Sequence, residues 1–417
     1  MAREATTSPA LVMDDLAALA TGRSSDFFAE DLRRHASEIR ERFEGRRVLV
    51  LGGAGSIGAS TVGLLSEFGP GSLHVADQNE SALAELVRDL RSRPAGLAVR
   101  DFRALPIDLG SPVMRRFLKM ERSYDWVLNF AALKHVRSEK DVCSILQMLD
   151  TNLLKPLDFW EWMQESGAAA PAYFSVSTDK AADPANLMGA SKRIMEHLMF
   201  CEKGPMASAQ RSTSSRFANV AFSNGSLLES FLRRFEKGQP LACPRETKRF
   251  FISLREAGEI CLLAAACGPD RHIVIPSLDP QKDTRQLDEI AVAFLRRKGL
   301  EPESYRDEEP ARVNVSRDLL RNRYPLLLTD LDTQGEKDSE IFAGKEEEVV
   351  EFGMSSVRAV RCRAISHEAL EEFVQQVRSF VRSPGQPVEK REIVDAVSRI
   401  VPDFHHLERH HTLDQRV

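Results

Sequence analysis

The sequence has no long hydrophobic run and few aromatic residues. Its longest apolar runs, such as ICLLAAAC at residues 260–267, are much shorter than the roughly 20 residues that a transmembrane helix needs. The opening stretch, MAREATTSPALVMDDLAAL, carries acids where a secretory signal needs a continuous apolar core. We therefore expect a soluble, cytoplasmic protein with no membrane partner.

Cysteine is scarce, and no charge of either sign dominates. The six cysteines show neither CxxC nor metal-ligand spacing, so we expect reduced thiols, no disulfide and no metal. The 57 basic and 62 acidic residues leave a formal net charge of -5, which provides no general attraction to nucleic acid. Any phosphate binding must therefore come from a few local residues.

What the chain does contain is a regular alternation of short apolar runs and helical patterns between Arg47 and Phe222. A composition of 42% hydrophobic and 29% charged residues is globular, and 417 residues indicate two joined lobes. Apolar runs that alternate with helices predict a parallel sheet covered on both faces. We expect an α/β, doubly wound Rossmann fold whose strands lie in RVLVLG, SLHVAD, RALPID, WVLNFAA, AYFSVST and RFANVAF.

The flanking regions predict a helical N-terminal arm (residues 1–45), a Rossmann domain (46–223) and a smaller C-terminal substrate lobe with an extension (224–417) that can interleave with it. The arm either contacts another subunit or lies on its own domain. Three late helices, in GSLLESFLRRFEKG, REAGEICLLAAACG and DEIAVAFLRRKG, are expected to cover the substrate. The charged DTQGEKDSEIFAGKEEEVVEF and the polar HHLERHHTLDQRV are interpreted as solvated or partner-facing segments.

A glycine-rich turn follows the first predicted strand. In VLVLGGAGSIG, both the GxGxxG spacing and the GxxGxxG spacing of short-chain dehydrogenases can be drawn. Such glycines allow a tight turn, a close approach of the backbone to a pyrophosphate, and close helix packing. We expect the cofactor to contact Gly52, Gly55, Ser56, Ile57 and Gly58.

The ends of the next strands complete the predicted cofactor site. Asp77 stands nineteen residues after Gly58, where a carboxylate binds the adenosine ribose hydroxyls of NAD. No Arg or Lys adjoins Asp77 in ADQNES to pair with a 2′-phosphate, so NAD is favoured over NADP. Asp108 is placed to meet the adenine, while Ala131 and Ala132 are small residues where the fourth strand passes the cofactor. Each could be an ordinary strand end, but the ordered set predicts NAD binding.

The stretch SVSTDKAADPANLMGASKR, at residues 175–193, lacks the tyrosine of the short-chain dehydrogenase pattern. In that pattern a Tyr and a Lys four residues later share one helix face, and here those positions are Met188 and Lys192. The preceding strand end carries Asp179 and Lys180. A dry pocket would keep Asp179 protonated as an acid and Lys180 neutral as a base. Because neighbours in a strand point to opposite faces, both reach one substrate only if the strand has become a loop; an exposed turn is the alternative.

The same residues resemble a known group. STDKAADPANLMGASKR, together with GGAGSIG, AALKHVRSEKD, RFANVAFSNGSL and KRFFISLREAGEI, resembles the UDP-N-acetylglucosamine 4,6-dehydratases of the CapD-like polysaccharide-biosynthesis group, in the extended short-chain dehydrogenase family. The resemblance covers roughly Arg46 to Ala266. Members of this group carry Tyr or Met at the position of Met188, so the missing phenol does not by itself predict an inactive enzyme.

The resemblance implies a reaction and a substrate site. NAD takes hydride from C4 of the sugar, Lys180 removes the C5 proton, Asp179 protonates the departing 6-hydroxyl, and hydride returns to C6. Lys134, Asn219 and Arg249 match positions near the substrate or its pyrophosphate, with His135 a weaker candidate. The group also implies a homo-oligomer. Thr178, Asp179 or a water near Lys192 would accept the C4 hydroxyl proton.

Three alternatives stay open at this point. The nucleotide can be UDP or GDP, since no motif distinguishes them. The enzyme can be an epimerase or a dehydratase that inverts C5, because all start from oxidation at C4. The chain can also be a catalytically silent NAD-binding sensor, for which the missing tyrosine is the main argument.

Overall fold

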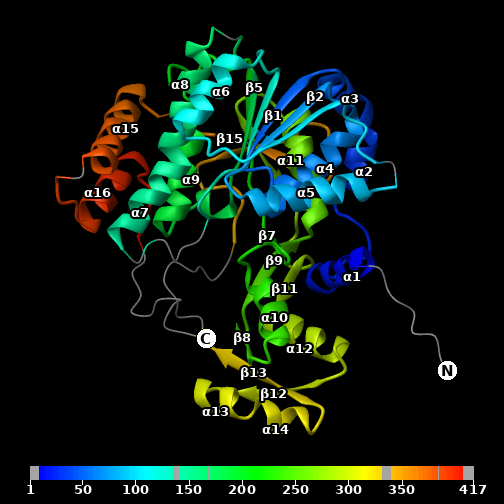
Figure 1. Cartoon of the computed structure of the whole chain (residues 1–417). Coiled ribbons are helices and arrows are strands. Elements are labelled where there is room, and N and C mark those ends of the chain that lie inside the picture. The colour runs from blue at the N-terminus through cyan, green and yellow to red at the C-terminus, as the bar shows by residue number, and fades with distance from the viewer. Residues whose placement is uncertain are drawn as a thin grey trace.

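A computed structural model describes residues 9–406 except 95, 135–138, 140, 168, 331–339, 364 and 384. Its helices and strands form a large lobe around a nine-stranded sheet and a smaller lobe below it in the view of Figure 1. Among the described residues, no helix combines the length and the hydropathy needed to cross a bilayer.

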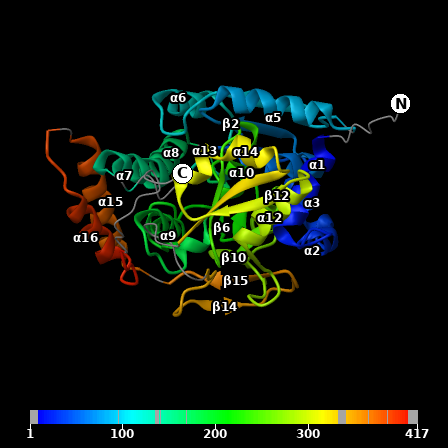
Figure 2. The same cartoon turned by 90° about the horizontal axis from the view of Figure 1, so that it is seen from below.

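The large sheet has the strand order β14-β15-β10-β6-β5-β4-β1-β2-β3. The seven strands from β3 to β10 in this order are parallel, whereas β15 runs antiparallel to β10 and β14 antiparallel to β15. Figure 2 shows β15 and β14 beside β10 at one edge. The predicted Rossmann fold is confirmed. The strands are β1 (Arg47–Leu51), β2 (Ser72–Ala76), β3 (Asp101–Leu105), β4 (Trp126–Asn129), β5 (Ala172–Val176), β6 (Arg211–Ser215), β10 (His272–Pro276), β14 (Glu348–Val350) and β15 (Val357–Arg361).

The sixth strand is not the predicted RFANVAF. It is β6, with the sequence RSTSS, and Asn219–Val220 form β7 in a separate small sheet. Two hydroxyls of this polar, buried strand have partners: Ser214 Oγ donates to Ser175 O at 2.8 Å, and Ser215 Oγ lies 3.7 Å from Cys261 Sγ. Among the described residues, Ser212 Oγ and Thr213 Oγ1 are buried without a hydrogen-bond partner. An apolar run was therefore the wrong criterion for this strand, whose polar side chains are buried by the elements around it.

Helices cover both faces of the large sheet. Figure 1 shows α8 and α9 on one side and α4 and α5 on the other. Helix α11 packs closely on α4 and β6, so this late segment belongs to the large lobe and not over the substrate as expected. The helices of this lobe are α4 (Ser56–Leu65), α5 (Glu80–Ser92), α6 (Pro112–Met120), α7 (Val142–Leu149), α8 (Lys155–Glu165), α9 (Leu187–Phe200), α11 (Leu254–Ala266), α15 (His367–Arg382) and α16 (Lys390–Ile400).

The smaller lobe has two three-stranded sheets and its own hydrophobic core. The sheets have the orders β11-β9-β7 and β12-β13-β8, and the core includes Phe231, Ile290, Phe294 and Tyr324. Its strands are β7 (Asn219–Val220), β8 (Leu241–Pro244), β9 (Lys248–Ile252), β11 (Thr284–Gln286), β12 (Glu301–Tyr305) and β13 (Arg323–Thr329). Its helices are α10 (Leu227–Glu236), α12 (Leu287–Arg297), α13 (Glu308–Val313) and α14 (Val315–Leu319).

The N-terminal arm packs on its own chain. Helix α1 (Pro9–Thr21) packs on β9, β11 and α12, whereas α2 (Ala29–Arg34) and α3 (Ala36–Phe43) pack on α11. Phe28, Ile39 and Phe43 are fully buried there. The helices of the arm therefore lie on their own chain, and a contact of the arm with another subunit stays a prediction.

Candidate active site

The glycine-rich turn forms a close-packed cradle between β1 and α4. Gly52 has φ +66°, and a Cβ there would lie 2.4 Å from Ala131 N. A Cβ on Gly58 would lie 2.6 Å from Gly52 O, whereas one on Gly55 would meet its nearest protein atom at an ordinary 3.5 Å. Gly52 and Gly58 are therefore required by the turn itself, while Gly55 leaves room for a ligand at the start of α4, which begins at Ser56.

The predicted carboxylates lie at the ends of neighbouring strands. Asp77 directly follows β2 and accepts hydrogen bonds from Ala54 N at 3.1 Å and from Asn79 N at 2.9 Å, so it is oriented by the glycine turn. Asp108 pairs with Lys155 Nζ at 2.6 Å. These contacts place Asp77 at the rim of the cradle and leave Asp108 engaged with a lysine.

Asn152 was missed by the sequence analysis but connects the cofactor strand to the active-site helix. It lies in a π-helical turn, Asp150–Leu154, between α7 and α8. Its side chain accepts from Leu133 N at 2.9 Å and donates to Leu133 O and to Ser191 Oγ, both at 3.0 Å. The turn beyond Ala131 and Ala132 is thus held against α9; the sequence carries no local signal for a π turn.

Helix α9 is buried on every side and carries Met188 and Lys192. Met188 is core-like, at 3% exposed, and its N–H donates to Glu139 Oε1 at 3.0 Å. Lys192 Nζ lies 3.1 Å from the Met195 sulfur. Burial lowers the pKa of Lys192 to about 8, partly offset by Glu196. Within the described part of the chain, this buried amine has a thioether as its hydrogen-bond partner, which fits a ligand that brings hydroxyl groups, such as the ribose of a dinucleotide.

The strand does break at the predicted acid–base pair. After β5, Asp179–Ala181 form a 3-10 turn, so Asp179 and Lys180 are not on opposite faces of a strand. Lys180 Nζ lies 3.3 Å from Asp179 Oδ1, and Thr178 Oγ1 donates to the same oxygen at 2.8 Å. Asp179 is 5% exposed and Lys180 is half-buried, so the exposed-turn alternative does not describe this site.

The charge state of Lys180 differs from the expectation. Burial disfavours the ammonium, but the carboxylates of Asp179 and Glu340 outweigh it and raise the pKa of Lys180. In the protein without substrate, this shift favours a protonated Lys180 over the desolvated, neutral lysine predicted from the sequence.

The predicted substrate residues lie at the edge of the smaller lobe. Asn219, in β7, donates to Phe250 O at 3.2 Å, and Arg249 lies on the adjacent β9. Lys134 as a whole is exposed, but the surrounding protein partly desolvates its amine, and this desolvation together with the charge of Lys180 lowers its pKa, against the attraction of Glu229. The charges of Lys134 and Lys180 therefore influence each other, whereas His135 lies outside the described residues.

Part of the charged segment that was expected to be solvated is buried in this site. The Glu340 side chain is 7% exposed, accepts from Phe250 N at 2.9 Å and from Asn219 Nδ2, and lies 3.6 Å from Arg249 Nε. The expectation is therefore wrong at this residue. It failed because a run of acidic residues was interpreted without the arginines, distant in sequence, that neutralise it.

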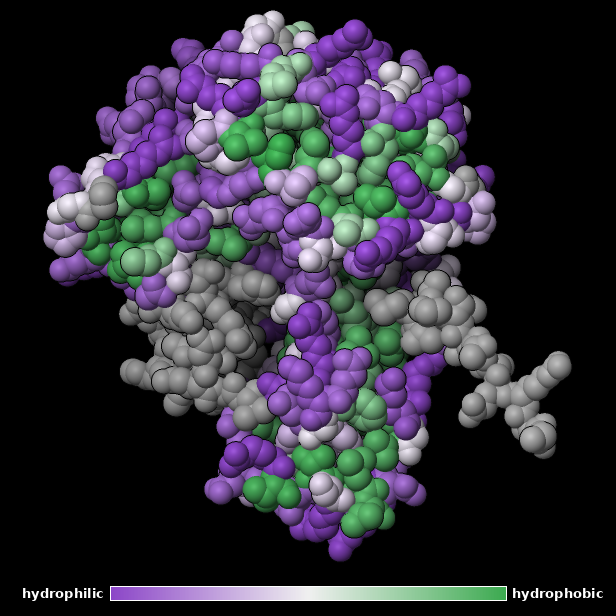
Figure 3. Space-filling view, viewed as in Figure 1, coloured by the Kyte–Doolittle hydropathy of each residue, from purple (hydrophilic) through white to green (hydrophobic). Residues whose placement is uncertain are grey.

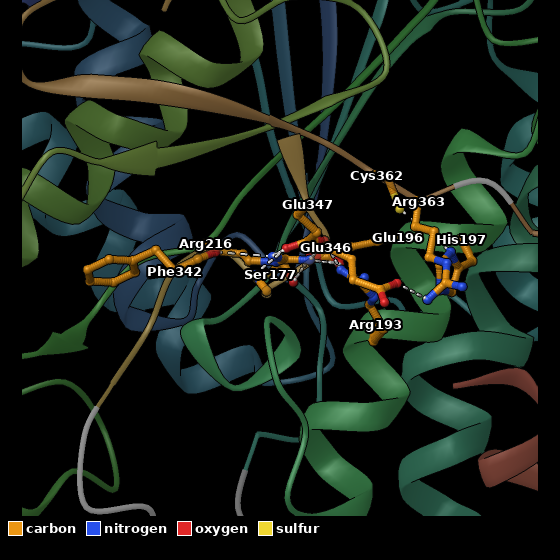
Figure 4. Close-up of polar contacts among 11 residues, drawn as sticks. Ser177, Arg193, Glu196, His197, Arg216, Phe342, Glu346, Glu347, Cys362 and Arg363 are labelled. Carbon is orange, nitrogen blue, oxygen red and sulfur yellow. Dashed lines mark hydrogen bonds and ion pairs between the residues drawn. The ribbon is translucent and has the colours of Figure 1, made fainter. Parts of the chain in front are cut away.

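A second buried carboxylate fixes the same segment (Figure 4). Glu347 pairs with Arg216, at 2.6 Å from Nη1, and with Arg193. Arg216 also binds both oxygens of Glu196 and donates to Phe342 O at 3.1 Å. Glu196 accepts from Ser177 Oγ at 2.6 Å, next to Thr178. The segment at residues 342–347 is thereby joined through charge pairs to the strand end that carries the acid–base pair.

The neighbouring side chains of Cys362 and His197 do not form a catalytic thiolate–imidazole pair. Cys362 Sγ lies 3.6 Å from His197 Nδ1 (Figure 4), but burial raises the pKa of the thiol to about 12 and lowers that of the imidazole to about 3. Both are neutral, so this is no thiolate nucleophile.

A separate cluster lies where the N-terminal arm meets α11. His35, Glu38 and Cys267 bring potential metal-ligand atoms within 4.8 Å of one another, beside the cations Arg42 and Arg211.

Comparisons with known proteins identify similar sequences. Among curated proteins, the chain is 30% identical over 273 residues to an uncharacterized membrane protein of Methanocaldococcus jannaschii, covering 64% of this chain and 77% of that protein. It is 26% identical to the capsular polysaccharide biosynthesis protein CapD of Staphylococcus aureus, covering 64% of this chain but only 43% of CapD. It is also 26% identical to an inverting UDP-N-acetylglucosamine 4,6-dehydratase of Campylobacter jejuni, covering 60% and 72%.

A solved structure supports the fold over most of the chain. Pen from Bacillus thuringiensis superimposes with a TM-score of 0.59 at 19% identity, covering 81% of this chain and 98% of Pen. The family model described as polysaccharide biosynthesis protein matches residues 48–314, which span the glycine cradle, the Asp179–Lys180 turn and Arg249. The chain belongs to this polysaccharide biosynthesis protein family, and the predicted resemblance to its CapD-like dehydratase group is confirmed.

Proposed function

We propose that the chain is an NAD-dependent nucleotide-sugar 4,6-dehydratase of the cytoplasm. It would convert UDP-N-acetylglucosamine, or the GDP analogue, to the 4-keto-6-deoxy sugar nucleotide for a surface polysaccharide or a nonulosonic acid. The observation that carries the proposal is the contact between the buried Asp179 and Lys180, at the strand end next to the glycine cradle. The similarity to the C. jejuni dehydratase supports the same reaction.

The cradle fits a dinucleotide for reasons internal to this chain. Gly55 leaves space where a pyrophosphate would approach the start of α4, and Asp77 is oriented at the rim of the cradle. The buried amine of Lys192 has no oxygen partner among the residues that the structure describes. Bound NAD would supply the oxidation of C4 and the hydride for C6. Asp77 favours NAD over NADP because a carboxylate repels a 2′-phosphate.

The acid–base pair needs only one internal proton shift to become active. Transfer of the Lys180 proton to Asp179 gives a neutral amine and a carboxylic acid. The amine then takes the C5 proton, and the acid protonates the departing 6-hydroxyl as water leaves. Elimination thus leaves an ammonium and a carboxylate. When hydride reaches C6, the ammonium returns a proton to C5, and the proton taken from the C4 hydroxyl then restores the ammonium, so the pair ends the turnover in its starting state.

Asn219 and Arg249 would bind the substrate's pyrophosphate, with Lys134 as a further cation. A guanidinium binds phosphate oxygens as a fork, which suits Arg249 for this role. Met188 has no proton to exchange. The C4 hydroxyl proton would therefore go to Thr178, to Asp179 or to a water near Lys192.

The product formed in deuterium oxide tests the proposal. Purified protein is incubated with UDP-N-acetylglucosamine, and separately with its GDP analogue, and the products are analysed by mass spectrometry and NMR. We expect loss of one water and one deuterium at C5, with the C5 configuration showing retention or inversion. A product of unchanged composition inverted at C4 would identify an epimerase instead, and no reaction despite bound NAD would identify a silent sensor.

A further inference from the structure

Strand β9 and helix α11 connect a predicted substrate residue to the cofactor cradle. Arg249 lies on β9, which ends at Ile252, and α11 begins at Leu254. Helix α11 in turn packs closely on α4, the helix that follows the glycine turn: a Cβ on Gly258 would lie 2.6 Å from Ser60 Oγ. The corner between β9 and α11 therefore sets how the substrate strand lies relative to the cradle.

One buried carboxylate, Glu256, organises this corner. Its Oε2 accepts from Ser253 N at 2.7 Å, and Glu256 N donates to Ser253 Oγ at 2.9 Å, which caps the start of α11. The N-terminal arm supplies the other donors. Phe27 N donates to Oε1 at 2.7 Å, and Arg23 binds both oxygens, with Nε 3.1 Å from Oε1 and Nη2 2.6 Å from Oε2. The Glu256 side chain is 2% exposed, so these donors replace water around its charge.

Arg23 joins the helix to the strand. Its Nη2, which binds Glu256, also donates to Phe251 O in β9 at 3.0 Å. Phe251 is the register partner of Asn219, a second predicted substrate residue, in β7. Nη1 of Arg23 is buried without a hydrogen-bond partner among the described residues, so the contacts of Nε and Nη2 hold the guanidinium. A planar guanidinium presents its donors in a rigid fork, and this fork fixes the carboxylate and the strand carbonyl relative to each other.

The arm is anchored in a different lobe on each side of Arg23. Figure 1 shows α1 beside the smaller lobe and α2 and α3 beside the large one. Leu16, on α1, lies in the core of the smaller lobe, whereas Phe28 lies in the large core. Asp31, on α2, accepts from Ser356 N at 2.7 Å and from Ser356 Oγ at 2.6 Å, just before β15 of the large sheet. Arg23 therefore lies where the arm passes from one lobe to the other.

We propose, building on the proposed function, that Arg23 is a positioning residue for the substrate strand: it fixes β9, and with it Arg249, relative to the cofactor cradle. Arg23 lies outside residues 48–314, which the family model matches. It acts on the sugar nucleotide through Phe251 O and Glu256, without touching it. Because hydride transfer requires C4 of the sugar to lie against the cofactor, a displaced β9 weakens nucleotide binding and misplaces the sugar.

Hydrogen exchange of the protein without ligand tests the positioning itself. Exchange of peptides within residues 248–252 is measured by mass spectrometry in full-length wild type and in Arg23→Gln. We expect roughly tenfold faster exchange of the β9 amides in Arg23→Gln, with wild-type exchange in β4, Trp126–Asn129. Unchanged exchange of β9 would overturn the proposal. Equal acceleration in β4 would show a general loss of stability and would also overturn it.

Two further variants control for the charge and for folding. Arg33 lies on the same arm, is exposed and pairs with Glu30, so Arg33→Gln should exchange like wild type throughout. Arg23→Lys keeps a positive charge beside Glu256 but lacks the fork, and it replaces Arg23→Gln if that variant does not fold. Exchange of β9 should also rise in Arg23→Lys, by less than in Arg23→Gln, and wild-type exchange there would contradict the proposal.

Nucleotide affinity connects the strand to the reaction. UDP, GDP and NAD are each titrated by calorimetry. We expect Arg23→Gln to weaken binding of UDP or GDP roughly tenfold and to raise KM for the sugar nucleotide by a similar factor, with NAD affinity unchanged. Equal losses for all three ligands would assign Arg23 a structural role only.

A double-mutant cycle tests whether the effect passes through Arg249. In an Arg249→Gln background, Arg23→Gln should cause little further loss of nucleotide affinity, because the residue that it positions is already absent. Additive losses would contradict the proposal. If β9 exchange rises in Arg23→Gln but wild-type protein binds neither UDP nor GDP, the positioning of the strand stands and the proposed function fails.

Discussion

At the scale of single residues, two lysines of the candidate site differ in their neighbours. Half-buried Lys180 lies beside Asp179, and the negative charges of Asp179 and Glu340 raise its pKa. Lys192 is buried with a thioether beside it, and its pKa is lowered to about 8. The pKa of a lysine side chain is therefore shifted in opposite directions at two positions twelve residues apart. We assign the proton chemistry to Lys180 and the ligand contact to Lys192.

Replacement of Lys180 tests the proposed base. Lys180→Ala should lower the rate of water loss by about 10²–10⁴-fold, the usual contribution of a general base, while NAD binding is retained. The measurements are deuterium incorporation at C5 and NAD affinity by calorimetry. Lys282→Ala, on an exposed lysine that pairs with Asp279, is the control and should match wild type. Normal turnover by Lys180→Ala would contradict the assignment.

Replacement of Lys192 by an apolar residue of similar length should stabilise the protein without NAD. The folded pKa of about 8 lies below the ordinary 10.5, so the folded state binds fewer protons than the unfolded state between these values. The penalty is full below about pH 8 and disappears as pH rises toward 10.5. Lys192→Met should therefore gain about 1–3 kcal/mol at pH 7 and little at pH 10, as measured by urea denaturation.

The same Lys192→Met variant should bind NAD more weakly, since the amine no longer meets the cofactor's hydroxyls. Gains in stability with losses in binding are typical of buried functional groups. A variant that is less stable than wild type at both pH values would show that the amine has favourable partners in the unliganded protein.

Two glycines of the cradle make a matched pair. Gly55→Ala should leave the thermal midpoint near that of wild type, because the added Cβ meets no protein atom closer than 3.5 Å. The same Cβ should weaken NAD binding at least tenfold, because it occupies space that the pyrophosphate would need. Gly58→Ala should destabilise the fold by about 1–3 kcal/mol, because its Cβ would lie 2.6 Å from Gly52 O. Thermal denaturation and calorimetry measure both; equal loss of stability in the two variants would contradict this distinction.

At the scale of elements, the segment at residues 342–347 is joined to the active-site helix α9 by buried ion pairs. Glu347, just before β14, and Glu196, on α9, both pair with Arg216, which follows β6. Helix α9 is also covered by α16. All fourteen residues of α9 are buried, so its sequence has no amphipathic pattern that would predict which face contacts which neighbouring element.

Removal of the Glu347 charge should show how much this connection contributes. Burial opposes ionisation of Glu347, but Arg216 and Arg193 outweigh it and lower its pKa to about 2, from an ordinary 4.5. The stabilisation is therefore present above about pH 4.5 and is lost as pH falls toward 2. Glu347→Gln should cost about 3 kcal/mol at pH 7 and much less near pH 2–3, in urea denaturation. Glu346→Gln, on an exposed neighbour, is the control, and a cost independent of pH would contradict the charge argument.

At the scale of the whole molecule, the chain has two large hydrophobic cores. The large core surrounds the nine-stranded sheet, and the second fills the smaller lobe. Figure 3 shows hydrophobic side chains gathered at the far end of the smaller lobe, where Val313, Leu319 and Leu320 are exposed. The chain crosses between the lobes several times: β7 lies in the smaller sheets, β10 in the large one, and β12 and β13 in the smaller lobe again.

The predicted homo-oligomer is tested on the intact chain. We expect light scattering after gel filtration to give a mass of at least twice the 46.7 kDa of one chain. The expectation comes from the resemblance to the dehydratase group. A mass of one chain over the whole concentration range would contradict it.

The parts that the sequence by itself determined are those built from consecutive residues. The glycine turn, Asp77 at its strand end and the Asp179–Lys180 turn each depend on local backbone geometry, so their spacing was sufficient to predict where they lie. Lys192, four residues after Met188, follows equally from the period of a helix.

Only the tertiary structure decided which charges and hydroxyls could be buried. Strand β6 was missed because its polar side chains are buried by distant elements, with the partners of Ser214 and Ser215 on β5 and α11. Glu340 was expected in solvent because Asn219 and Arg249 are about a hundred residues away in sequence. A polar group is buried at low cost only where distant residues satisfy it. The protonation state of Lys180 depends on the same long-range contacts, since Glu340 reaches it only through the fold.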